Sequence, residues 1–305
     1  MTLAGSMNSA VDVSIGEYLE TERLRVDREL DRVLPPETEP PKSIHRAMRY
    51  SVLPGGKRLR PILCLECGRL FEAYDEALLS ASAALELVHT YSLIHDDLPA
   101  MDNDDLRRGR PTNHRVFGEA LAILTGDALL TLAFEVISQT DAIPAELQLR
   151  LINELAYALG TRGLIGGQVA DLAAAEQKVS EESLEYIHRT KTGALISASA
   201  RTGALVAGAP EEDIARVTEY GQRVGLAFQI ADDLLDVLGS EQELGKAVHK
   251  DGGQHKATYP AFYGVEESRR IAQRLVREAC EALAPYGTRA RRLNEIAQYL
   301  ITRHS

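Results

Sequence analysis

Residues 224–237 read Val-Gly-Leu-Ala-Phe-Gln-Ile-Ala-Asp-Asp-Leu-Leu-Asp-Val, a strongly apolar stretch that contains three aspartates. On a helix, Asp232 and Asp236 lie one turn apart on the same face, whereas Asp233 points about 100° away. Two carboxylates on one face of an apolar helix need a partner or a metal ion, because burying a bare charge is prohibitively costly. Carboxylate oxygens without His or Cys partners favour Mg²⁺ over Zn²⁺. The stretch therefore predicts a buried helix that carries part of a metal site.

A second acidic cluster lies in residues 94–111, which read Ile-His-Asp-Asp-Leu-Pro-Ala-Met-Asp-Asn-Asp-Asp-Leu-Arg-Arg-Gly-Arg-Pro. Repulsion among so many carboxylates is costly unless a cation or water screens them. One such cluster is often only a solvated acidic loop, but two clusters in one chain favour a shared metal site. Its aspartates are Asp96, Asp97, Asp102, Asp104 and Asp105.

Around these clusters the chain is patterned almost entirely as helix. Leu, Ala, Glu and Arg, which favour helices, recur throughout, and alternating β-branched runs bounded by turns are missing. We predict an all-α, single-domain bundle of about ten or more helices over residues 1–305. Residues 1–41 form an N-terminal helix and a proline-rich connector. The helical patterns cover residues 8–34, 42–53, 58–72, 75–97, 114–138, 145–160, 164–177, 181–208, 211–239, 265–284 and 288–302.

Charge and composition exclude several classes of protein. The formal net charge of −11 disfavours a general role in binding nucleic acid or an anionic membrane. No continuous run approaches the roughly 18 apolar residues of a membrane span, so we expect no stable membrane insertion. The acidic N-terminal segment lacks the apolar region of a signal peptide. Three cysteines cannot build a disulfide framework, and we expect a reduced, cytoplasmic protein.

Basic residues flank both acidic clusters. The first group follows Gly55-Gly56 at the start of a predicted helix, where free backbone N–H groups would add to side-chain charge in binding phosphate. Taken singly, each is most simply a solvated surface charge. Together with the two acidic clusters, they favour a site for diphosphate and Mg²⁺. The candidate cations are Lys57, Arg58, Arg60, Arg107, Arg108, Lys191, Lys246 and Lys256.

The chain resembles the trans-prenyl diphosphate synthases of the bacterial farnesyl and geranylgeranyl type. The likeness covers nearly the whole sequence, from Gly-Gly-Lys-Arg-Leu-Arg-Pro at 55–61 through Lys-Thr-Gly at 191–193 to Lys-Ala-Thr-Tyr-Pro at 256–260. In the first aspartate motif, four residues including Pro99-Ala100 separate the two groups of aspartates, as in the bacterial and plant form. The second motif is Asp-Asp-x-x-Asp, whereas class I terpene cyclases carry an Asn/Asp-Ser-Glu pattern there. The segment at Val248-His249 is less typical of the family.

The resemblance implies a particular fold and a magnesium site. The fold would be of the isoprenoid synthase type, with helices around a central substrate cavity. Three Mg²⁺ ions would bind with the diphosphate of the allylic substrate. Their implied ligands are Asp96, Asp102 and Asp232, with Asp236 close by, directly or through water. Asp97 and Asp233 match the motifs and are less expected as direct ligands, so their contact with metal stays open.

The resemblance also implies two substrate subsites. Arg107, Lys191 and Lys246 would contact the allylic diphosphate, with Thr192 and Gln229 facing its reacting end. Lys57, Arg60, His89 and Arg108 would bind isopentenyl diphosphate. Lys256 is also expected among the substrate-binding residues, and Gln168 and Asp171 match a Gly-Gln-x-x-Asp element near the floor of the site.

The implied activity is a short-chain prenyl transfer in isoprenoid biosynthesis. Breaking the allylic C–O bond leaves diphosphate and a carbocation, so metals and cations already in place lower the barrier. The double bond of isopentenyl diphosphate then attacks, and a proton is lost to the released diphosphate. We expect farnesyl diphosphate from dimethylallyl and geranyl diphosphates, with geranylgeranyl diphosphate as the alternative product. A class I terpene cyclase, a non-catalytic regulatory subunit and a metal-dependent phosphohydrolase are the alternatives of other classes.

Chain length and assembly are two further expectations. Tyr91 and Ser92 lie one turn before Asp96, on the side of the helix that would line the product channel. A tyrosine there would block the growing prenyl chain. Alternatively, Tyr91 packs elsewhere and another helix closes the end of the channel. Apolar stripes on the predicted helices suggest a homodimer.

Overall fold

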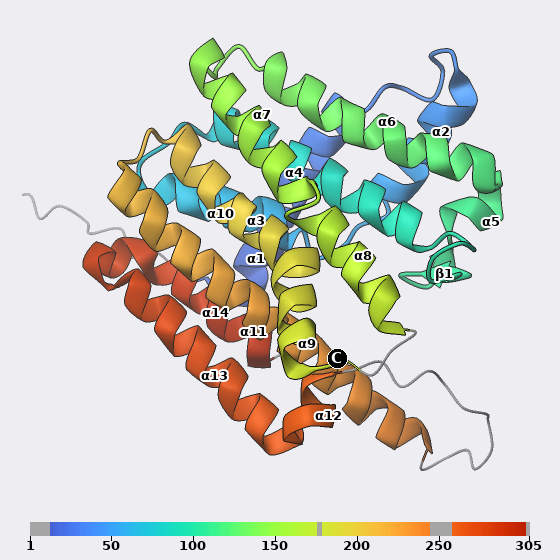
Figure 1. Cartoon of the computed structure of the whole chain (residues 1–305). Coiled ribbons are helices and arrows are strands. Elements are labelled where there is room, and N and C mark those ends of the chain that lie inside the picture. Colours follow the sequence, from blue (N-terminus) through green and yellow to red (C-terminus); the bar gives the residue numbers. More distant parts are fainter. Residues whose placement is uncertain (1–12, 176–178, 245–257, 303–305) are drawn as a thin grey trace, which may run out of the picture.

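The computed structural model describes residues 13–175, 179–244 and 258–302, and these residues form an almost entirely helical bundle (Figure 1). Lys246, Val248-His249 and Lys256 lie outside the described residues. The α-helices are α1 (Ile15–Val33), α2 (Lys42–Val52), α3 (Leu59–Leu70), α4 (Asp75–Asp96), α5 (Asn113–Phe117), α6 (Glu119–Ser138), α7 (Ala145–Leu159), α8 (Leu164–Ala175), α9 (Glu181–Ile187), α10 (Ala194–Val206), α11 (Glu211–Leu244), α12 (Tyr259–Tyr263), α13 (Val265–Ala282) and α14 (Arg291–Thr302).

The all-α fold class predicted from the sequence is confirmed, and the helix boundaries differ at identifiable residues. The predicted helix 114–138 is two helices, because Gly118 has a φ of +85° and ends α5 before α6 begins. The predicted helix 181–208 contains a π-helix, His188–Gly193, between α9 and α10. α1 begins later than predicted, where Ser14 and Glu17 form a capping box.

A short β-hairpin is the main element that the sequence did not predict. Strands β1 (Leu106–Arg107) and β2 (Arg110–Pro111) pair antiparallel. Arg108 and Gly109, the two residues between them, have φ values of +53° and +72°. Two consecutive positive φ angles characterise the tight two-residue turns that match the twist of a hairpin. The hairpin follows the first aspartate motif and fixes the direction of Arg107 and Arg108.

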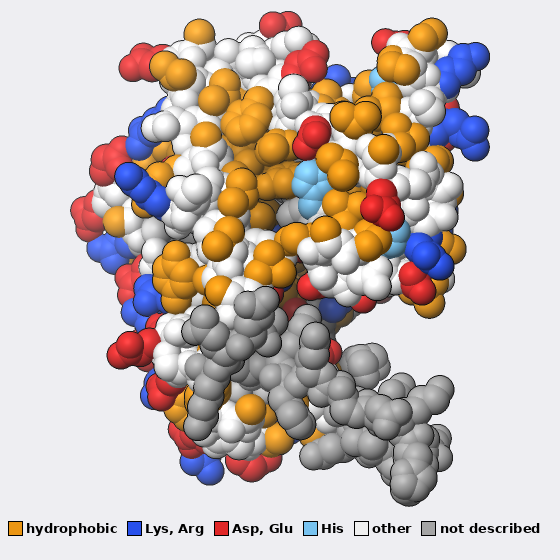
Figure 2. Space-filling model, turned by 45° about the vertical axis from the view of Figure 1, so that its right-hand side comes forward, with side chains coloured by type: hydrophobic (Ala, Val, Ile, Leu, Met, Phe, Trp, Pro, Cys, Tyr) orange, Lys and Arg blue, Asp and Glu red, His pale blue; other side chains and the backbone are white. Residues whose placement is uncertain are grey.

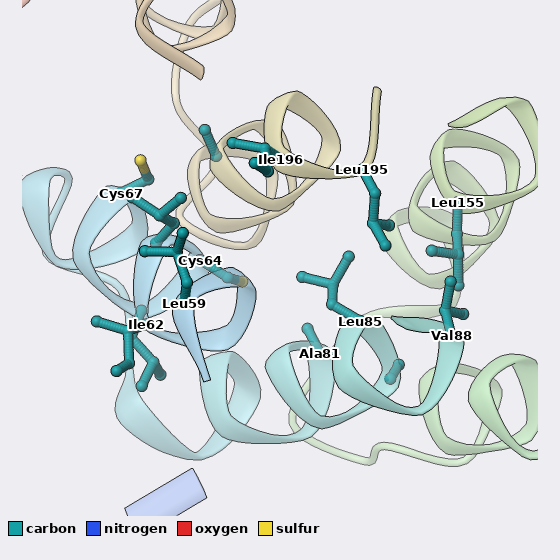
Figure 3. Packing of buried hydrophobic residues seen from close by; sticks show 14 of the residues in the cluster. Leu59, Ile62, Cys64, Cys67, Ala81, Leu85, Val88, Leu155, Leu195 and Ile196 are labelled. Carbon is teal, nitrogen blue, oxygen red and sulfur yellow. The ribbon is translucent and has the colours of Figure 1, made fainter. Parts of the chain in front are cut away.

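Helices α3, α4 and α10 lie at the centre of the bundle, with α11 against α10 and α13 (Figure 1). α4 is buried on nearly all sides, so its sequence is apolar around the whole circumference. Gly203 of α10 has no side chain, and a Cβ there would lie 2.1 Å from the Cys64 carbonyl oxygen of α3. The two backbones are therefore in close contact. Figure 3 shows this core, with Leu85 and Val88 of α4 among the side chains that fill it.

Within the described part of the chain, two helices, α4 and α6, are long and apolar enough to cross a membrane by length and composition alone. In α4, 83% of the apolar window is buried inside the protein, which identifies it as a core helix. In α6 only 33% of the window is buried. Apolar side chains on the rest of α6, among them Ile123 and Leu124, are exposed.

Candidate active site

A cavity of about 600 Å³ opens between the N-terminus of α3, helix α4 and helices α1 and α14. One of its walls is the turn before α3, in which Gly55 and Gly56 have φ values of +93° and +141°. A Cβ on Gly56 would lie 2.6 Å from the Arg108 guanidinium carbon. The positive φ angle favours glycine at this position, and a side chain there would displace the Arg108 guanidinium. Arg108 in turn donates a hydrogen bond to the Gly55 carbonyl oxygen.

The structure brings together the four residues that we expected to bind isopentenyl diphosphate, since Lys57, Arg60, His89 and Arg108 all line this cavity. Burial lowers the pKa of Arg60 to about 10, and the Nε atom of Arg60 has no hydrogen-bond partner in the described part of the chain. Burial, together with the nearby arginines, holds the pKa of His89 well below its usual value. Positive charge is therefore concentrated and desolvated here, as a binding site for an anion requires.

Arg58, which the sequence placed among the candidate cations of this group, has a different role. Its side chain is fully buried, and it donates hydrogen bonds to Asp27, Glu86 and the Val52 carbonyl oxygen at 2.8, 2.7 and 2.6 Å. A buried guanidinium needs such complete pairing, because an unpaired charge in the interior is costly. Arg58 thus fixes the turn before α3 to α1 and α4, and its charge is neutralised within the protein.

The first aspartate motif begins at the C-terminal end of α4. The pKa of Asp96 is raised to about 6, mainly by burial. The negative charges of Asp102 and Asp97 contribute to this rise, whereas Lys191 and Arg107 oppose it. The Asp102 backbone N–H donates to the Asp96 carbonyl oxygen at 2.9 Å, which folds the loop back over the helix end. Neither Asp96 nor Asp102 has a salt bridge with any residue that the structure describes. These carboxylates are therefore available for a cation.

Asp97 is already paired within the protein. It is buried, and the Arg107 guanidinium donates to Asp97 Oδ1 from both Nε and an Nη atom, at 2.9 and 2.5 Å. Arg107 also forms a salt bridge with Asp104 at 3.2 Å. Arg107, which we expected to contact the allylic diphosphate, is therefore paired with two carboxylates of the acidic loop.

The second aspartate motif lies on α11, with the helical offset expected from the sequence. Asp232 is half-buried and Asp236 is exposed, whereas Asp233 is buried with only 5% of its surface exposed. Asp233 accepts hydrogen bonds from His188 Nε2 and the Tyr259 backbone N–H, both at 3.0 Å. The three aspartates of the motif thus divide into two near the surface and one that is tied to neighbouring elements.

The π-helix lies between α8 and α11 and contacts both. Its Lys191 Nζ lies 2.6 Å from Asp171 of α8, and Thr192 Oγ1 donates to Gln229 Oε1 of α11 at 2.9 Å. A Cβ on Gly167 of α8 would lie 2.2 Å from the Lys191 backbone nitrogen, so the two helices touch here. π-helical turns insert an extra residue and often occur at functional sites. Here Lys191 pairs with α8 and Thr192 with α11, and Lys191 is close enough to Asp96 for its charge to oppose the rise in the pKa of Asp96.

Mg²⁺ is the metal that this set of residues fits. Among the described residues, no three His, Cys, Asp or Glu side chains converge as a ready-made metal site. Asp96 and Asp102 are close enough to raise the pKa of Asp96, and a cation between them would relieve that repulsion. Oxygen donors that leave room for water and phosphate oxygens suit Mg²⁺, which is usually bound by one or two carboxylates and substrate phosphates.

The two residues expected at the product channel occupy one turn of α4. Tyr91 is 5% exposed, and its ring meets that of His95 edge-on with 5.7 Å between centroids. The buried Tyr91 hydroxyl has no hydrogen-bond partner in the described part of the chain. Ser92 donates to the His89 carbonyl oxygen at 2.9 Å. The buried part of the α4 surface before Asp96 is therefore occupied by a bulky aromatic ring.

Sequence reasoning missed the residues that hold the site in place. His188, Glu86 and Tyr259 are buried or line the cavity, and each contacts a motif residue or Arg58. One signal was available for Asp233, because a carboxylate that points away from its neighbours on an apolar helix must have a partner. Nothing local indicated which residue that partner would be.

Comparison with known proteins places these features in context. The family model described as polyprenyl synthetase matches residues 41–289. The chain is 47% identical over 292 residues to a dimethylallyltranstransferase of Fischerella ambigua, covering 95% of this chain and 84% of that protein. It is 49% identical over 267 residues to a geranylgeranyl diphosphate synthase of Cyanophora paradoxa, covering 87% and 89%. The crystal structure of an FPP/GFPP synthase from Zymomonas mobilis superposes with a TM-score of 0.84 at 39% identity, covering 94% and 99%.

The raised pKa of Asp96 leads to a prediction about stability. The folded protein binds a proton at Asp96 more tightly than the unfolded chain does, so ionisation of this group costs stability as the pH rises from about 4 to about 6. In metal-free buffer at pH 7.5, we expect Asp96→Asn to raise the free energy of unfolding by about 1 to 3 kcal/mol. At pH 4 the difference from wild type should largely vanish. Urea unfolding at both pH values measures it, and equal effects at both would contradict the assignment.

Proposed function

Because the chain belongs to the polyprenyl synthetase family and is a prenyltransferase, we propose that it condenses isopentenyl diphosphate with dimethylallyl and geranyl diphosphates to form farnesyl diphosphate. The observation that carries the proposal is the separation of two kinds of charge. A cavity lined by desolvated cations lies on one side of α4, and available carboxylates lie at the C-terminal end of the same helix. Two diphosphates can thus be bound differently, one by cations alone and the other through metal.

We assign isopentenyl diphosphate to the cationic cavity. Lys57, Arg60 and Arg108 would neutralise its diphosphate, and His89, neutral because its pKa is strongly lowered, would donate a hydrogen bond. Arg60 Nε, which is buried and has no partner among the described residues, is the donor that most needs such an acceptor.

We assign the allylic diphosphate to the aspartate motifs. Asp96, Asp102 and Asp232 would hold three Mg²⁺ ions with Asp236 nearby, and Lys191, Arg107 and Lys246 would complete the positive surroundings, with Lys256 as a further contact. When bound, Mg²⁺ neutralises the leaving diphosphate. Thr192 directly follows Lys191, and Gln229 lies about one helical turn before Asp232. Both would face the allylic carbon as positive charge develops there. The apolar walls of the bundle would exclude water from the carbocation, and the released diphosphate would accept the proton lost at the end.

Product analysis tests the proposed function. With isopentenyl and dimethylallyl diphosphates and Mg²⁺, we expect acyclic prenyl diphosphates whose formation stops with EDTA and resumes when Mg²⁺ is added back. Asp96→Ala and Asp232→Ala should each lower kcat by about 1,000-fold or more, because charge stabilisation of the leaving group is lost. Cyclic hydrocarbons would instead indicate a terpene cyclase, free phosphate a phosphohydrolase, and no turnover a regulatory subunit.

The two subsites should be separable by kinetics. Lys57→Ala and Arg60→Ala should raise the KM for isopentenyl diphosphate about tenfold or more, since each removes a charge-assisted hydrogen bond. Lys191→Ala should act mainly on the allylic substrate. Arg216→Ala is a control, because this arginine pairs with Glu212 on the surface of α11 far along the helix. Steady-state rates with each substrate varied in turn give the result, and the reverse pattern would exchange the two subsites.

Tyr91, together with Ser92, is our candidate for the residue that stops chain growth. Its ring is buried on α4 about one turn before Asp96. A product chain that extends from the diphosphate at Asp96 along α4 would therefore meet this ring. We expect Tyr91→Ala to shift the product from farnesyl to geranylgeranyl diphosphate or longer chains, whereas exposed Tyr157→Ala should leave it unchanged. Chromatography of the dephosphorylated products decides. A wild-type enzyme that already makes mainly geranylgeranyl diphosphate would favour the alternative product, which the named relatives also support.

We also propose that two copies of the chain associate through the apolar surface of α6. Ile123 and Leu124 are 45% and 54% exposed, and hydrophobic side chains gather on this side of the molecule around a hollow (Figure 2). An exposed apolar helix face of this kind is typical of an interface. Light scattering should give the mass of a homodimer for wild type and for Tyr74→Ser, an exposed site elsewhere, and of a monomer for Leu124→Glu. A monomeric wild type would overturn this proposal.

A further inference from the structure

Asp233 and His188 form a buried network that the proposed division of the site into subsites does not use. His188 is 7% exposed and Asp233 is 5% exposed. The His188 ring stacks on Tyr259, with 5.5 Å between centroids and 22° between planes. Three elements meet here: the π-helix, α11 and the start of α12. Such a network fixes the relative position of its elements only if every polar group in it is satisfied.

The hydrogen bonds of this network continue to Thr192. Gln229 lies one turn before Asp233 on α11, and its Nε2 donates to Asp233 Oδ1 at 3.4 Å. The other end of the same amide, Oε1, accepts the hydroxyl proton of Thr192 at 2.9 Å. The order of donation is therefore Thr192 to Gln229, then Gln229 to Asp233, with His188 and the Tyr259 N–H as the other donors to Asp233.

The chemistry of these groups allows only one direction for the chain of hydrogen bonds. An ionised carboxylate accepts hydrogen bonds and donates none, so the Gln229 amide must turn its NH₂ group toward Asp233. Its carbonyl oxygen then faces Thr192, and the Thr192 hydroxyl must donate to it. Because the one proton of the hydroxyl is committed, the remaining side of the Thr192 oxygen presents lone pairs only. If the Gln229 amide were reversed, the Thr192 proton would be free to point the other way.

We propose that His188 and Asp233 are positioning residues that orient Gln229 so that Thr192 presents oxygen lone pairs, and not its proton, to the reacting carbon of the allylic substrate. This inference rests on the proposed function, in which that carbon becomes positively charged as its bond to diphosphate breaks. A lone pair facing the carbon stabilises the developing charge, whereas a hydroxyl proton would oppose it. Asp233 therefore acts through two side chains and does not itself touch the substrate or a metal.

A double-mutant cycle tests this role against a merely structural one. We expect Asp233→Asn to lower kcat by about 10- to 100-fold, with the KM values of both substrates changed less than about threefold. Thr192→Val, which removes the lone pairs at constant shape, should lower kcat similarly. In the Thr192→Val background, Asp233→Asn should then have little further effect, because the hydroxyl that Asp233 orients through Gln229 is already absent. If Asp233→Asn costs the same factor in both backgrounds, Asp233 only supports the fold and the proposal is wrong.

A compensating pair provides a second test, which also holds if one single variant is poorly folded. Asp233→Asn combined with Gln229→Glu exchanges donor and acceptor at constant net charge. The amide introduced on the Asp233 side would donate to the carboxylate introduced on the Gln229 side, and that carboxylate would still accept from Thr192. We expect the pair to recover kcat at least about tenfold over the lower of the two single variants. A pair no faster than that variant would overturn the proposal.

Matched variants at the edge of the network complete the design. His188→Gln keeps a donor toward Asp233 and should retain more activity than His188→Leu, which has none. Equal losses would contradict the proposed order of donors. Tyr263→Phe is the control, since Tyr263 stacks on Tyr259 but its hydroxyl donates to Glu181 at the surface, and its kcat should match wild type. Failure of the wild-type enzyme to form prenyl diphosphates would overturn the proposed function, whereas a turning-over wild type with an unaffected Asp233→Asn would overturn only the positioning role.

Discussion

Close packing of α3, α4 and α10 holds the separate parts of the site together. Gly203 lets the α10 backbone touch that of α3, and α4 is buried on almost every side. Each of these helices carries one edge of the site. The cationic turn precedes α3, Asp96 ends α4, and the π-helix with Lys191 leads into α10. Because close-packed interiors transmit small shifts, a disturbance of this contact would move all three edges together.

The site itself is a balance between charges that the protein satisfies and charges that it leaves available. Arg58, Asp97 and Asp233 are buried and paired by short hydrogen bonds from or to neighbouring elements. Arg60 and Asp96 are also largely buried, yet their pKa values are shifted because desolvation is not fully offset. Unsatisfied buried charge lowers stability. This cost arises at Arg60 and Asp96, where a diphosphate or a cation would bind. It does not arise at the paired Arg58, Asp97 and Asp233.

This division also explains why adjacent residues of one motif differ in role. Asp232 and Asp233 are neighbours in sequence, but the helical rotation of about 100° turns one toward the surface and the other toward His188. Arg58 and Arg60 also differ in role, because Arg58 precedes α3 in a left-handed conformation, whereas Arg60 lies in its first turn. A motif of repeated residues therefore contains both binding groups and groups that hold them in place.

Local physical chemistry is enough to predict the helices and the faces on which their carboxylates lie. The periodicity of apolar residues placed nearly every α-helix, and the spacing in 224–237 separated Asp233 from Asp232 and Asp236 before any contact was known. The β-hairpin was missed because its turn depends on Arg108, a residue that rarely adopts a positive φ. The break at Gly118 was missed because a glycine also occurs inside helices.

Which charged residues are paired and which remain available depends on contacts between helices that are distant in the sequence. Arg58 meets Asp27 and Glu86, and Asp233 meets His188, across separations of 28 to 45 residues in the sequence. No local pattern encodes such a meeting, because it depends on how whole helices pack. Local sequence patterns account for the helical fold and for the kinds of charge in the site. The packing of distant helices determined where each charge is desolvated, and desolvation decides whether a charged group binds a ligand or supports the fold.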